Sequence, residues 1–194
     1  MANRIMLNQT SYHGAGAIGE IVNEAKARGF KKALVCSDPD LIRFGVSTKV
    51  TDLLDQAGLA YEIYDDIKAN PTIENVQHGV KAFADAGADY IIAIGGGSPI
   101  DAAKAMWIKY EHPEVTFEDM CKVFGLPKLR TKAHFCAIPS TSGTATEVTA
   151  FSIITDYEKG IKYPIADFEI TPDVAIVDPD LAETMPKKLV AHTG

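Results

Sequence analysis

Strand-sized apolar runs alternate with longer amphipathic segments along most of this 194-residue chain. Ala33–Ser37 and Tyr90–Ile94 are apolar at nearly every position, which is typical of strands buried on both faces of a parallel sheet. The same pattern predicts further strands at Arg4–Asn8, Tyr61–Tyr64, Phe135–Ile138 and Val174–Val177.

The segments between these strands have the periodicity of helices, and several stop at a glycine, such as Gly29, Gly58 or Gly87. The predicted helices are Ala17–Arg28, Asp40–Gln56 with a break near Gly45, Thr72–Ala86 and Ser98–Tyr110. Strands that alternate with helices predict an α/β fold, a doubly wound parallel sheet of the Rossmann-like type. Such sheets bind ligands at the carboxyl ends of their strands.

Two later stretches differ from this alternation. Ser152–Tyr163, with Glu158-Lys159-Gly160 at its centre, predicts a β-hairpin. The stretch Pro113–Lys132 is too irregular for any element to be assigned.

Composition narrows the class of protein. Hydrophobic residues make up 46% and charged residues 23%, as in ordinary globular domains, and the formal net charge is -7. An acidic chain without a Lys/Arg run is a poor partner for nucleic acid, and no apolar stretch reaches the ~18 residues of a membrane span. The N-terminus lacks the pattern of a secretion signal, and the 3 cysteines are expected as reduced thiols, so we expect a cytoplasmic protein.

The strongest ligand-binding motif follows the strand Tyr90–Ile94, where Gly95-Gly96-Gly97-Ser98 leads straight into a helix. Glycines let the backbone approach a ligand closely, and the free N–H groups of a helix N-terminus suit a diphosphate. Ser98 is expected to cap the helix, Pro99 to take its first position, and Asp101 to act as the acid of a capping box. A tight strand-to-helix turn without a ligand is the alternative.

A second glycine motif, Gly14-Ala15-Gly16-Ala17-Ile18-Gly19, matches the G-x-G-x-x-G dinucleotide fingerprint, and Asp38 follows at about the expected spacing. The fingerprint needs its glycines directly after a strand, whereas Gln9–His13 separate this motif from the strand predicted to end at Asn8. We therefore favour a glycine-rich turn that starts a helix here, and expect the diphosphate at Gly95–Ser98.

Two further strand ends carry polar groups. A carboxylate at Asp38, after the strand Ala33–Ser37, can accept both hydroxyls of an adenosine ribose and would repel a 2′-phosphate, which favours NAD over NADP. The alternative is a turn residue before Pro39. The hydroxyl-rich segment IPSTSGTATEVT, residues 138–149, can bind phosphate or ribose without fixed charge, although a capped helix start has the same composition.

The segments ALVCSD, GGGSPIDAAK, IPSTSGTATEVT and TPDVAIVDPDLAETMP, in this order, resemble the iron-containing (group III) alcohol dehydrogenases. The similarity covers essentially the whole chain and implies the N-terminal domain of the dehydroquinate synthase-like/iron alcohol dehydrogenase fold. MANRIMLNQT, ADYIIAIGGGSP and TDYEKGIKYPI are most similar to the branch of the family that interconverts lactaldehyde and 1,2-propanediol. The resemblance thus implies hydride transfer between NAD and small alcohols, diols or aldehydes.

The resemblance also implies contacts with the cofactor. Gly96, Gly97 and Ser98 would bind the pyrophosphate, Asp38 the adenosine ribose, and Lys162 would lie near the nicotinamide ribose. Ser140 stands where close relatives carry threonine. The complete set of predicted cofactor-binding residues is Asp38, Asn70, Gly95, Gly96, Gly97, Ser98, Asp101, Ser140, Thr141, Thr144, Thr149, Lys162 and Leu181.

In this family an Fe²⁺ ion, held by one aspartate and three histidines of a second, helical domain, polarises the substrate oxygen. Residues 1–185 are therefore expected to form the dinucleotide-binding domain and 186–194 the start of the helical domain, with the first liganding aspartate two residues beyond Gly194. The 5 histidines of the chain show no ligand spacing, so no metal ligand or catalytic residue is expected within it. We expect the isolated chain to be inactive and to expose an apolar face where the second domain would pack.

Two alternatives stay open on the sequence. The chain could be the cofactor domain of a dehydroquinate synthase-like lyase, a zinc enzyme with a related glycine-rich architecture, or a non-catalytic dinucleotide-binding module. The resemblance further implies a homodimer formed through the N-terminal strand.

Overall fold

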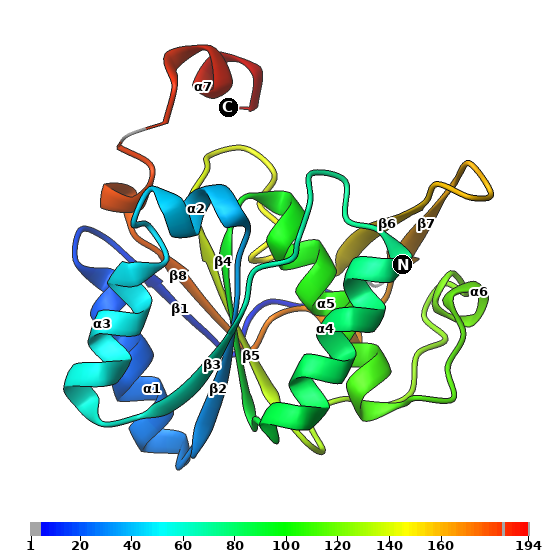
Figure 1. Cartoon of the computed structure of the whole chain (residues 1–194), viewed down its shortest axis with the longest axis horizontal. Coiled ribbons are helices and arrows are strands. Elements are labelled where there is room, and N and C mark those ends of the chain that lie inside the picture. Colours follow the sequence, from blue (N-terminus) through cyan, green and yellow to red (C-terminus); the bar gives the residue numbers. More distant parts are fainter. Residues whose placement is uncertain (1–4, 184, 194) are drawn as a thin grey trace.

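The computed structural model describes residues 5–183 and 185–193, which form the predicted doubly wound α/β fold (Figure 1). The strands of the main sheet are β1 (Thr10–His13), β2 (Lys32–Cys36), β3 (Ala60–Tyr64), β4 (Tyr90–Gly95), β5 (His134–Pro139) and β8 (Val174–Val177). They are parallel and lie in the order β1-β8-β5-β4-β2-β3. The predicted hairpin is a separate antiparallel pair, β6 (Phe151–Asp156) and β7 (Ile161–Ala166).

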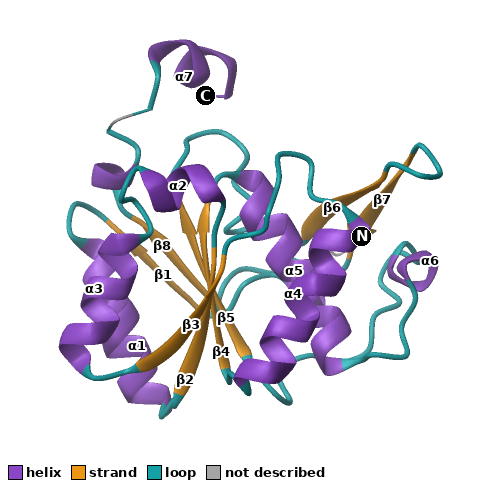
Figure 2. Ribbon diagram, in the orientation of Figure 1, coloured by secondary structure: helices purple, strands orange, loops and turns teal. Residues whose placement is uncertain are grey.

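Helices cover both faces of the main sheet (Figure 2). The four long ones are α1 (Glu20–Arg28) and α3 (Thr48–Ala57) on one face, and α4 (Ile73–Ala86) and α5 (Gly97–Glu111) on the other. Strand β4 serves both layers: Ile92 and Ile94 pack with α1 and α3, whereas Ile91 and Ala93 pack with α4 and α5. Its continuous apolar run is therefore explained by burial on two faces.

Shorter elements complete the chain. Three are the α-helices α2 (Pro39–Arg43), α6 (Phe117–Met120) and α7 (Lys187–Thr193), and three are the 3₁₀ helices Ala17–Gly19, Phe168–Ile170 and Pro179–Leu181. Helices α2 and α3 confirm the predicted break near Gly45, where the chain turns with a φ of 73°. Helix α6 lies in the stretch that could not be assigned from the sequence, and it begins at a capping box formed by Thr116 and Asp119.

The first strand lies later in the chain than predicted. Residues 5–8 form no strand, and Arg4, where the predicted strand begins, lies outside the described residues. Ile5 and Leu7 are exposed, so their apolar character does not mark a buried strand. Strand β1 lies instead at the edge of the sheet beside β8, with exposed and half-buried residues alternating along it. An edge strand of this kind needs little hydrophobicity, which is why the apolar pattern missed it.

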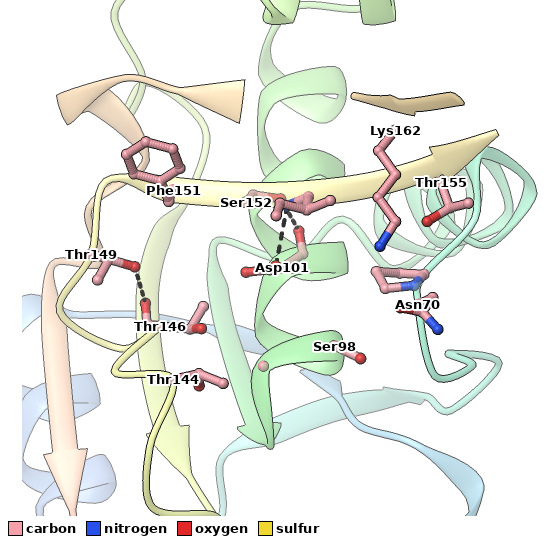
Figure 3. Close-up of a pocket in the computed structure, with 13 residues that line it drawn as sticks. Asn70, Ser98, Asp101, Thr144, Thr146, Thr149, Phe151, Ser152, Thr155 and Lys162 are labelled. Atoms are coloured by element: carbon pink, nitrogen blue, oxygen red, sulfur yellow. Dashed lines mark hydrogen bonds between the residues drawn. The ribbon is translucent and has the colours of Figure 1, made fainter. Parts of the chain in front are cut away.

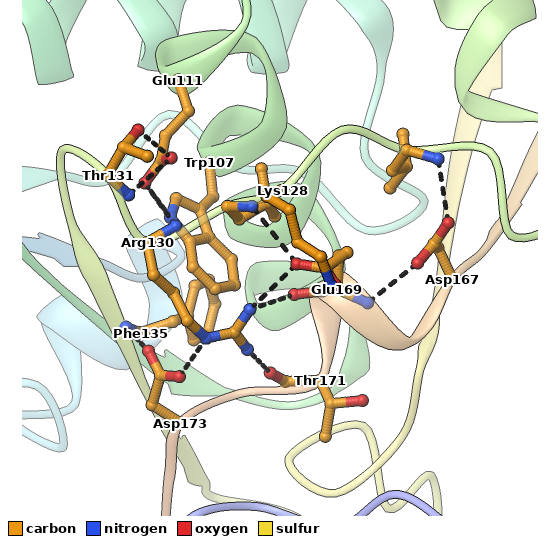
Figure 4. A network of polar contacts seen from close by, with 12 residues as sticks. Trp107, Glu111, Lys128, Arg130, Thr131, Phe135, Asp167, Glu169, Thr171 and Asp173 are labelled. Atoms are coloured by element: carbon orange, nitrogen blue, oxygen red, sulfur yellow. Dashed lines mark hydrogen bonds and ion pairs between the residues drawn. The ribbon is translucent and has the colours of Figure 1, made fainter. Parts of the chain in front are cut away.

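Two buried carboxylates hold the segment that enters β5 (Figure 4). Glu111, the last residue of α5, accepts hydrogen bonds from the backbone N–H groups of residues 130–133 and from the indole of Trp107. Asp173, just before β8, accepts one from the N–H of Phe135 at 2.9 Å and pairs with the guanidinium of Arg130. These contacts fix β5 and β8 relative to α5, and so fix where the carboxyl end of β5 emerges.

Candidate functional site

The strand order reverses between β2 and β4, because the chain leaves β2 toward β3 and then returns to β4 on the other side of β2. A doubly wound sheet opens a crevice at such a point, beyond the carboxyl ends of the strands. The connection after β2 carries Asp38, and the one after β4 carries the glycine motif. Ser37 joins them, since its Oγ donates to the carbonyl oxygen of Ile94 at 3.1 Å. The structure therefore brings the two predicted features to neighbouring strand ends.

The glycine motif is packed too tightly for larger residues. Gly95 has a φ of 153°, which side chains rarely adopt, and a Cβ on it would lie 2.6 Å from Pro99 Cγ. A Cβ on Gly96 would lie 3.3 Å from Thr141 Oγ1, and one on Gly97 would lie 3.3 Å from Thr144 Cγ2. The hydroxyl-rich segment after β5 thus lies directly against the glycines.

Helix α5 begins earlier than predicted. Gly96 is its N-cap and Gly97 its first residue, and no side chain within the described ranges caps this end. Ser98 is therefore not the cap, and Pro99 is not the first helical residue. Asp101 is not a capping-box acid either: its Oδ2 accepts from the N–H of Ile153 at 3.1 Å. Because the glycines make the turn without a side-chain cap, the first N–H groups of the helix remain open to the cleft.

A cavity of about 500 Å³ lies beside this helix start (Figure 3). It is closed by the hydroxyl-rich segment on one side and by the β6–β7 hairpin on the other. Figure 3 shows Lys162, from β7, pointing toward Asn70 across from Ser98. The predicted cofactor-binding residues that line this cavity are Asn70, Gly97, Ser98, Asp101, Thr144, Thr149 and Lys162.

A second, more apolar cavity of about 430 Å³ lies on the α2 side. Its walls include Leu41, Val46 and three predicted residues, Ser140, Thr141 and Leu181. The Oγ of Ser140 is buried and has no hydrogen-bond partner among the described residues.

Three predicted residues line neither cavity: Asp38, Gly95 and Gly96. The Oδ1 of Asp38 accepts from the N–H of Leu41 at 2.9 Å and caps α2. Gly95 and Gly96 shape the turn between the cavities rather than their walls.

Sequence reasoning missed one charged residue beside the site. Lys104 is fully buried in α5, and its Nζ donates to the backbone of the hydroxyl-rich segment. Burial lowers the pKa of Lys104, and burial raises the pKa of Asp101, which lies one helical turn earlier. Asp101 and Lys104 are three residues apart in GGGSPIDAAK, so they lie on one face of the helix. This spacing is a sequence signal that could have drawn attention to Lys104.

The first glycine motif follows β1 directly, because that strand ends at His13. The objection that Gln9–His13 intervene was therefore wrong. The expectation of a turn that starts a helix still fits, since the Oδ2 of Asp178 accepts from the N–H of Ile18 at 3.1 Å. A buried carboxylate of the chain thus accepts from an N–H group at this helix start, the kind of donor that a phosphate would need.

No group of three His, Cys, Asp or Glu residues within 5–183 and 185–193 is placed to hold a metal ion. In the same ranges, no helix is both long and apolar enough to cross a bilayer.

Known proteins match the whole chain. A family model described as iron-containing alcohol dehydrogenase matches residues 8–179. The chain is 53% identical to the NADPH-dependent butanol dehydrogenase of Clostridium saccharobutylicum, covering 98% of the chain and 48% of that protein. It is 47% identical to the lactaldehyde reductase of Escherichia coli (strain K12), covering 100% of the chain and 50% of that protein.

Solved structures of known proteins also match the whole chain. A 1,3-propanediol oxidoreductase matches with a TM-score of 0.93 and 30% identity, covering 100% of this chain and 50% of that one. The sulfoacetaldehyde reductase of Bifidobacterium kashiwanohense, solved in complex with NAD⁺, matches with a TM-score of 0.89 and 26% identity over 100% of this chain and 50% of that one. The chain spans about half the length of the relatives it matches. By sequence and by fold, the chain belongs to the iron-containing alcohol dehydrogenase family.

Proposed function

We propose that the chain binds NAD in the crevice between β2 and β4 and serves an oxidoreductase that interconverts small alcohols or diols and aldehydes, of the lactaldehyde/1,2-propanediol type. The observation that carries the proposal is the uncapped N-terminus of α5, which faces a cavity lined by hydroxyl groups. A diphosphate suits both, because helix N–H groups and hydroxyls donate hydrogen bonds to its oxygens. Family membership favours this reaction over that of a lyase.

The residues present fit such a cofactor. Gly97 and Ser98 would bind the diphosphate, while Thr144 and Thr149, which line the same cavity, would donate from the facing segment. The buried Oγ of Ser140, which lacks a partner among the described residues, would gain one. When bound, NAD supplies the hydride acceptor or donor of the reaction.

A charge at Asp38 supports NAD rather than NADP. The Oδ1 of this carboxylate caps α2, which leaves Oδ2 for the ribose hydroxyls. Repulsion between two unit charges about 4 Å apart ranges from roughly 1 kcal/mol in water to about 4 kcal/mol near a protein surface. A 2′-phosphate should therefore bind at least about fivefold more weakly.

The remaining chemistry would come from outside this chain. The described residues contain no candidate ligand set for iron, and the relatives are about twice as long. We propose that residues 1–185 form the cofactor domain, that 186–194 begin the helical domain, and that this chain alone oxidises no alcohol. A homodimer through β1 is also proposed, since that strand lies at the sheet edge.

Calorimetric titration of the chain with NADH and then NADPH tests the cofactor proposal. We expect saturable NADH binding, weaker NADPH binding, and loss of the difference in Asp38→Asn, which keeps the α2 cap but removes the charge. The matched control is Asp40→Asn, because Asp40 is an exposed carboxylate of the same helix that pairs with Arg43. A folded chain that binds neither cofactor, or an Asp38→Asn variant that still discriminates, contradicts the proposal.

A further inference from the structure

A buried ammonium group lies directly behind the hydroxyl-rich segment. Lys104 is 0% exposed, and its Nζ donates to the carbonyl oxygens of Thr146 and Thr149, both at 2.7 Å, and of Phe151 at 2.9 Å. An ammonium has three N–H donors, so the three carbonyls use all of them. None of these acceptors belongs to the helix that carries the lysine.

The segment that receives these bonds has little structure of its own. Residues 141–150 form no helix or strand, and Ala145 has a φ of 51°, unusual for a residue other than glycine. Within the segment, backbone bonds join only neighbouring turns, such as Val148 N–H to Ala145 O at 3.0 Å. From outside, Asn8 Nδ2 also donates to Glu147 O at 2.9 Å.

We propose that Lys104 is a positioning residue that sets the shape of residues 144–151, so that their hydroxyls face the glycine motif at the distance a dinucleotide diphosphate requires. The inference rests on the proposed cofactor site and deepens it. Lys104 acts through the backbone and touches no ligand itself, whereas Thr144 and Thr149 line the cavity.

Stability of the core alone does not explain a lysine here. A buried charge loses hydration, and apolar replacements of buried ionic groups are often neutral or stabilising. The charged groups that face Lys104 are Asp101 of its own helix and Glu147 of the hydroxyl-rich segment, and both favour the protonated form. A methionine would fill the same space without desolvating a charge, so what the lysine adds is its three directed hydrogen bonds.

The test compares Lys104→Met with Lys109→Met in the same chain. Lys109 is a matched control, because it lies in the same helix and its Nζ also donates to two loop carbonyls, those of Pro113 and Val115, none of which lines the cavity. Amide hydrogen exchange of a peptide spanning residues 144–151 is measured without ligand, and NADH affinity is measured by calorimetry. Lys104→Gln, which retains two N–H donors but no charge, serves as a milder variant.

We expect Lys104→Met to keep its circular dichroism spectrum and to exchange amide hydrogens faster in residues 144–151. It should bind NADH at least about tenfold more weakly, which corresponds to the free energy of one lost hydrogen bond to a charged group. Lys104→Gln should be intermediate, and Lys109→Met should match the unmodified chain in both readouts. Unchanged exchange in a folded Lys104→Met variant overturns the proposal, whether or not the unmodified chain binds NADH. Failure of both Lys104 variants to fold also overturns it, because the lysine would then serve the whole fold.

Discussion

Replacing Glu111 by glutamine should destabilise the fold strongly, although the two side chains are nearly the same size. One carboxylate oxygen of Glu111 accepts from Trp107 Nε1 at 3.1 Å and from three backbone N–H groups at 2.9–3.2 Å. The other accepts from the N–H of Thr131 at 2.9 Å and from its hydroxyl at 2.7 Å. A glutamine has only one such oxygen, so its NH₂ group must face donors.

The cost follows from these contacts. In the better orientation of Glu111→Gln, the NH₂ faces Thr131, whose hydroxyl can turn and accept while its N–H stays unpaired. An unpaired buried N–H costs about 1–3 kcal/mol, and the remaining bonds weaken because the acceptor is no longer charged. We expect a loss of about 2–4 kcal/mol in the free energy of unfolding, or roughly 4–16 °C in the melting temperature of a domain of this size.

The pH dependence gives a second readout. Burial raises the pKa of Glu111, but the N–H groups and the hydroxyl of Thr131 outweigh it, so the net pKa is lowered. A lowered pKa stabilises the fold above the pKa of the unfolded chain, and this part is lost as pH falls through the folded value. The difference between the unmodified chain and Glu111→Gln should therefore be largest near pH 7 and should shrink below about pH 4.

Urea unfolding at several pH values measures both effects. Glu114→Gln is the matched control, because Glu114 is an exposed residue close in sequence that pairs with His112, and its replacement should leave the free energy of unfolding nearly unchanged. A Glu111→Gln variant within about 1 kcal/mol of the unmodified chain at pH 7 would show that the carboxylate does not hold the segment before β5.

Three further outcomes are expected. Gly79→Ala should lower the free energy of unfolding in urea by about 1–3 kcal/mol, since its Cβ would lie 2.5 Å from Met106 Sδ. Equal stability would mean that the interface between α4 and α5 repacks freely. Gly97→Ala should weaken NADH binding about tenfold in calorimetry and lower the melting temperature slightly, because its Cβ would lie 3.3 Å from Thr144 Cγ2 and press on the segment that lines the cavity; unchanged affinity would contradict a diphosphate at Gly97. Cys121, which is half-buried, should react first with a thiol reagent, because the other cysteines are fully buried and burial raises the pKa of both thiols; rapid labelling of all three would contradict that.

The central sheet could be predicted because burial on both faces leaves a pattern in every residue of a strand. Tyr90–Ile94 is the clearest case, and its predicted and observed starts coincide. Strand β1 lacks that pattern, since as an edge strand it is only partly buried, and its pairing depends on β8, which lies 160 or so residues later. Apolar pattern alone therefore favoured the exposed stretch before it.

The candidate site likewise has parts that local motifs predict and parts that depend on contacts between distant segments. Local motifs identified the glycine turn and the hydroxyl-rich segment, and the structure brings them into contact at Gly96 and Thr141. The spacing of Lys104 from Asp101 could have drawn attention to it, but its role could not be predicted, because its partners lie 42–47 residues away and are backbone carbonyls, which carry no residue signature. The role of Asp101 was predicted from its own helix, whereas its bond to Ile153 N–H depends on where the hairpin docks.

The two glycine motifs differ in whether the chain itself supplies an anion to the N–H groups at the helix start. Both follow a strand and open a helix, so both present N–H groups and a partial positive charge to an anion. At the first, Asp178 comes from a loop 160 residues away and its carboxylate accepts from Ile18 N–H, so the chain itself supplies the anion. At the second, the nearest acid of the helix, Asp101, turns its carboxylate to the hairpin instead. The N–H groups after Gly96 therefore keep their capacity to bind an anion, which is why we propose that the diphosphate binds there.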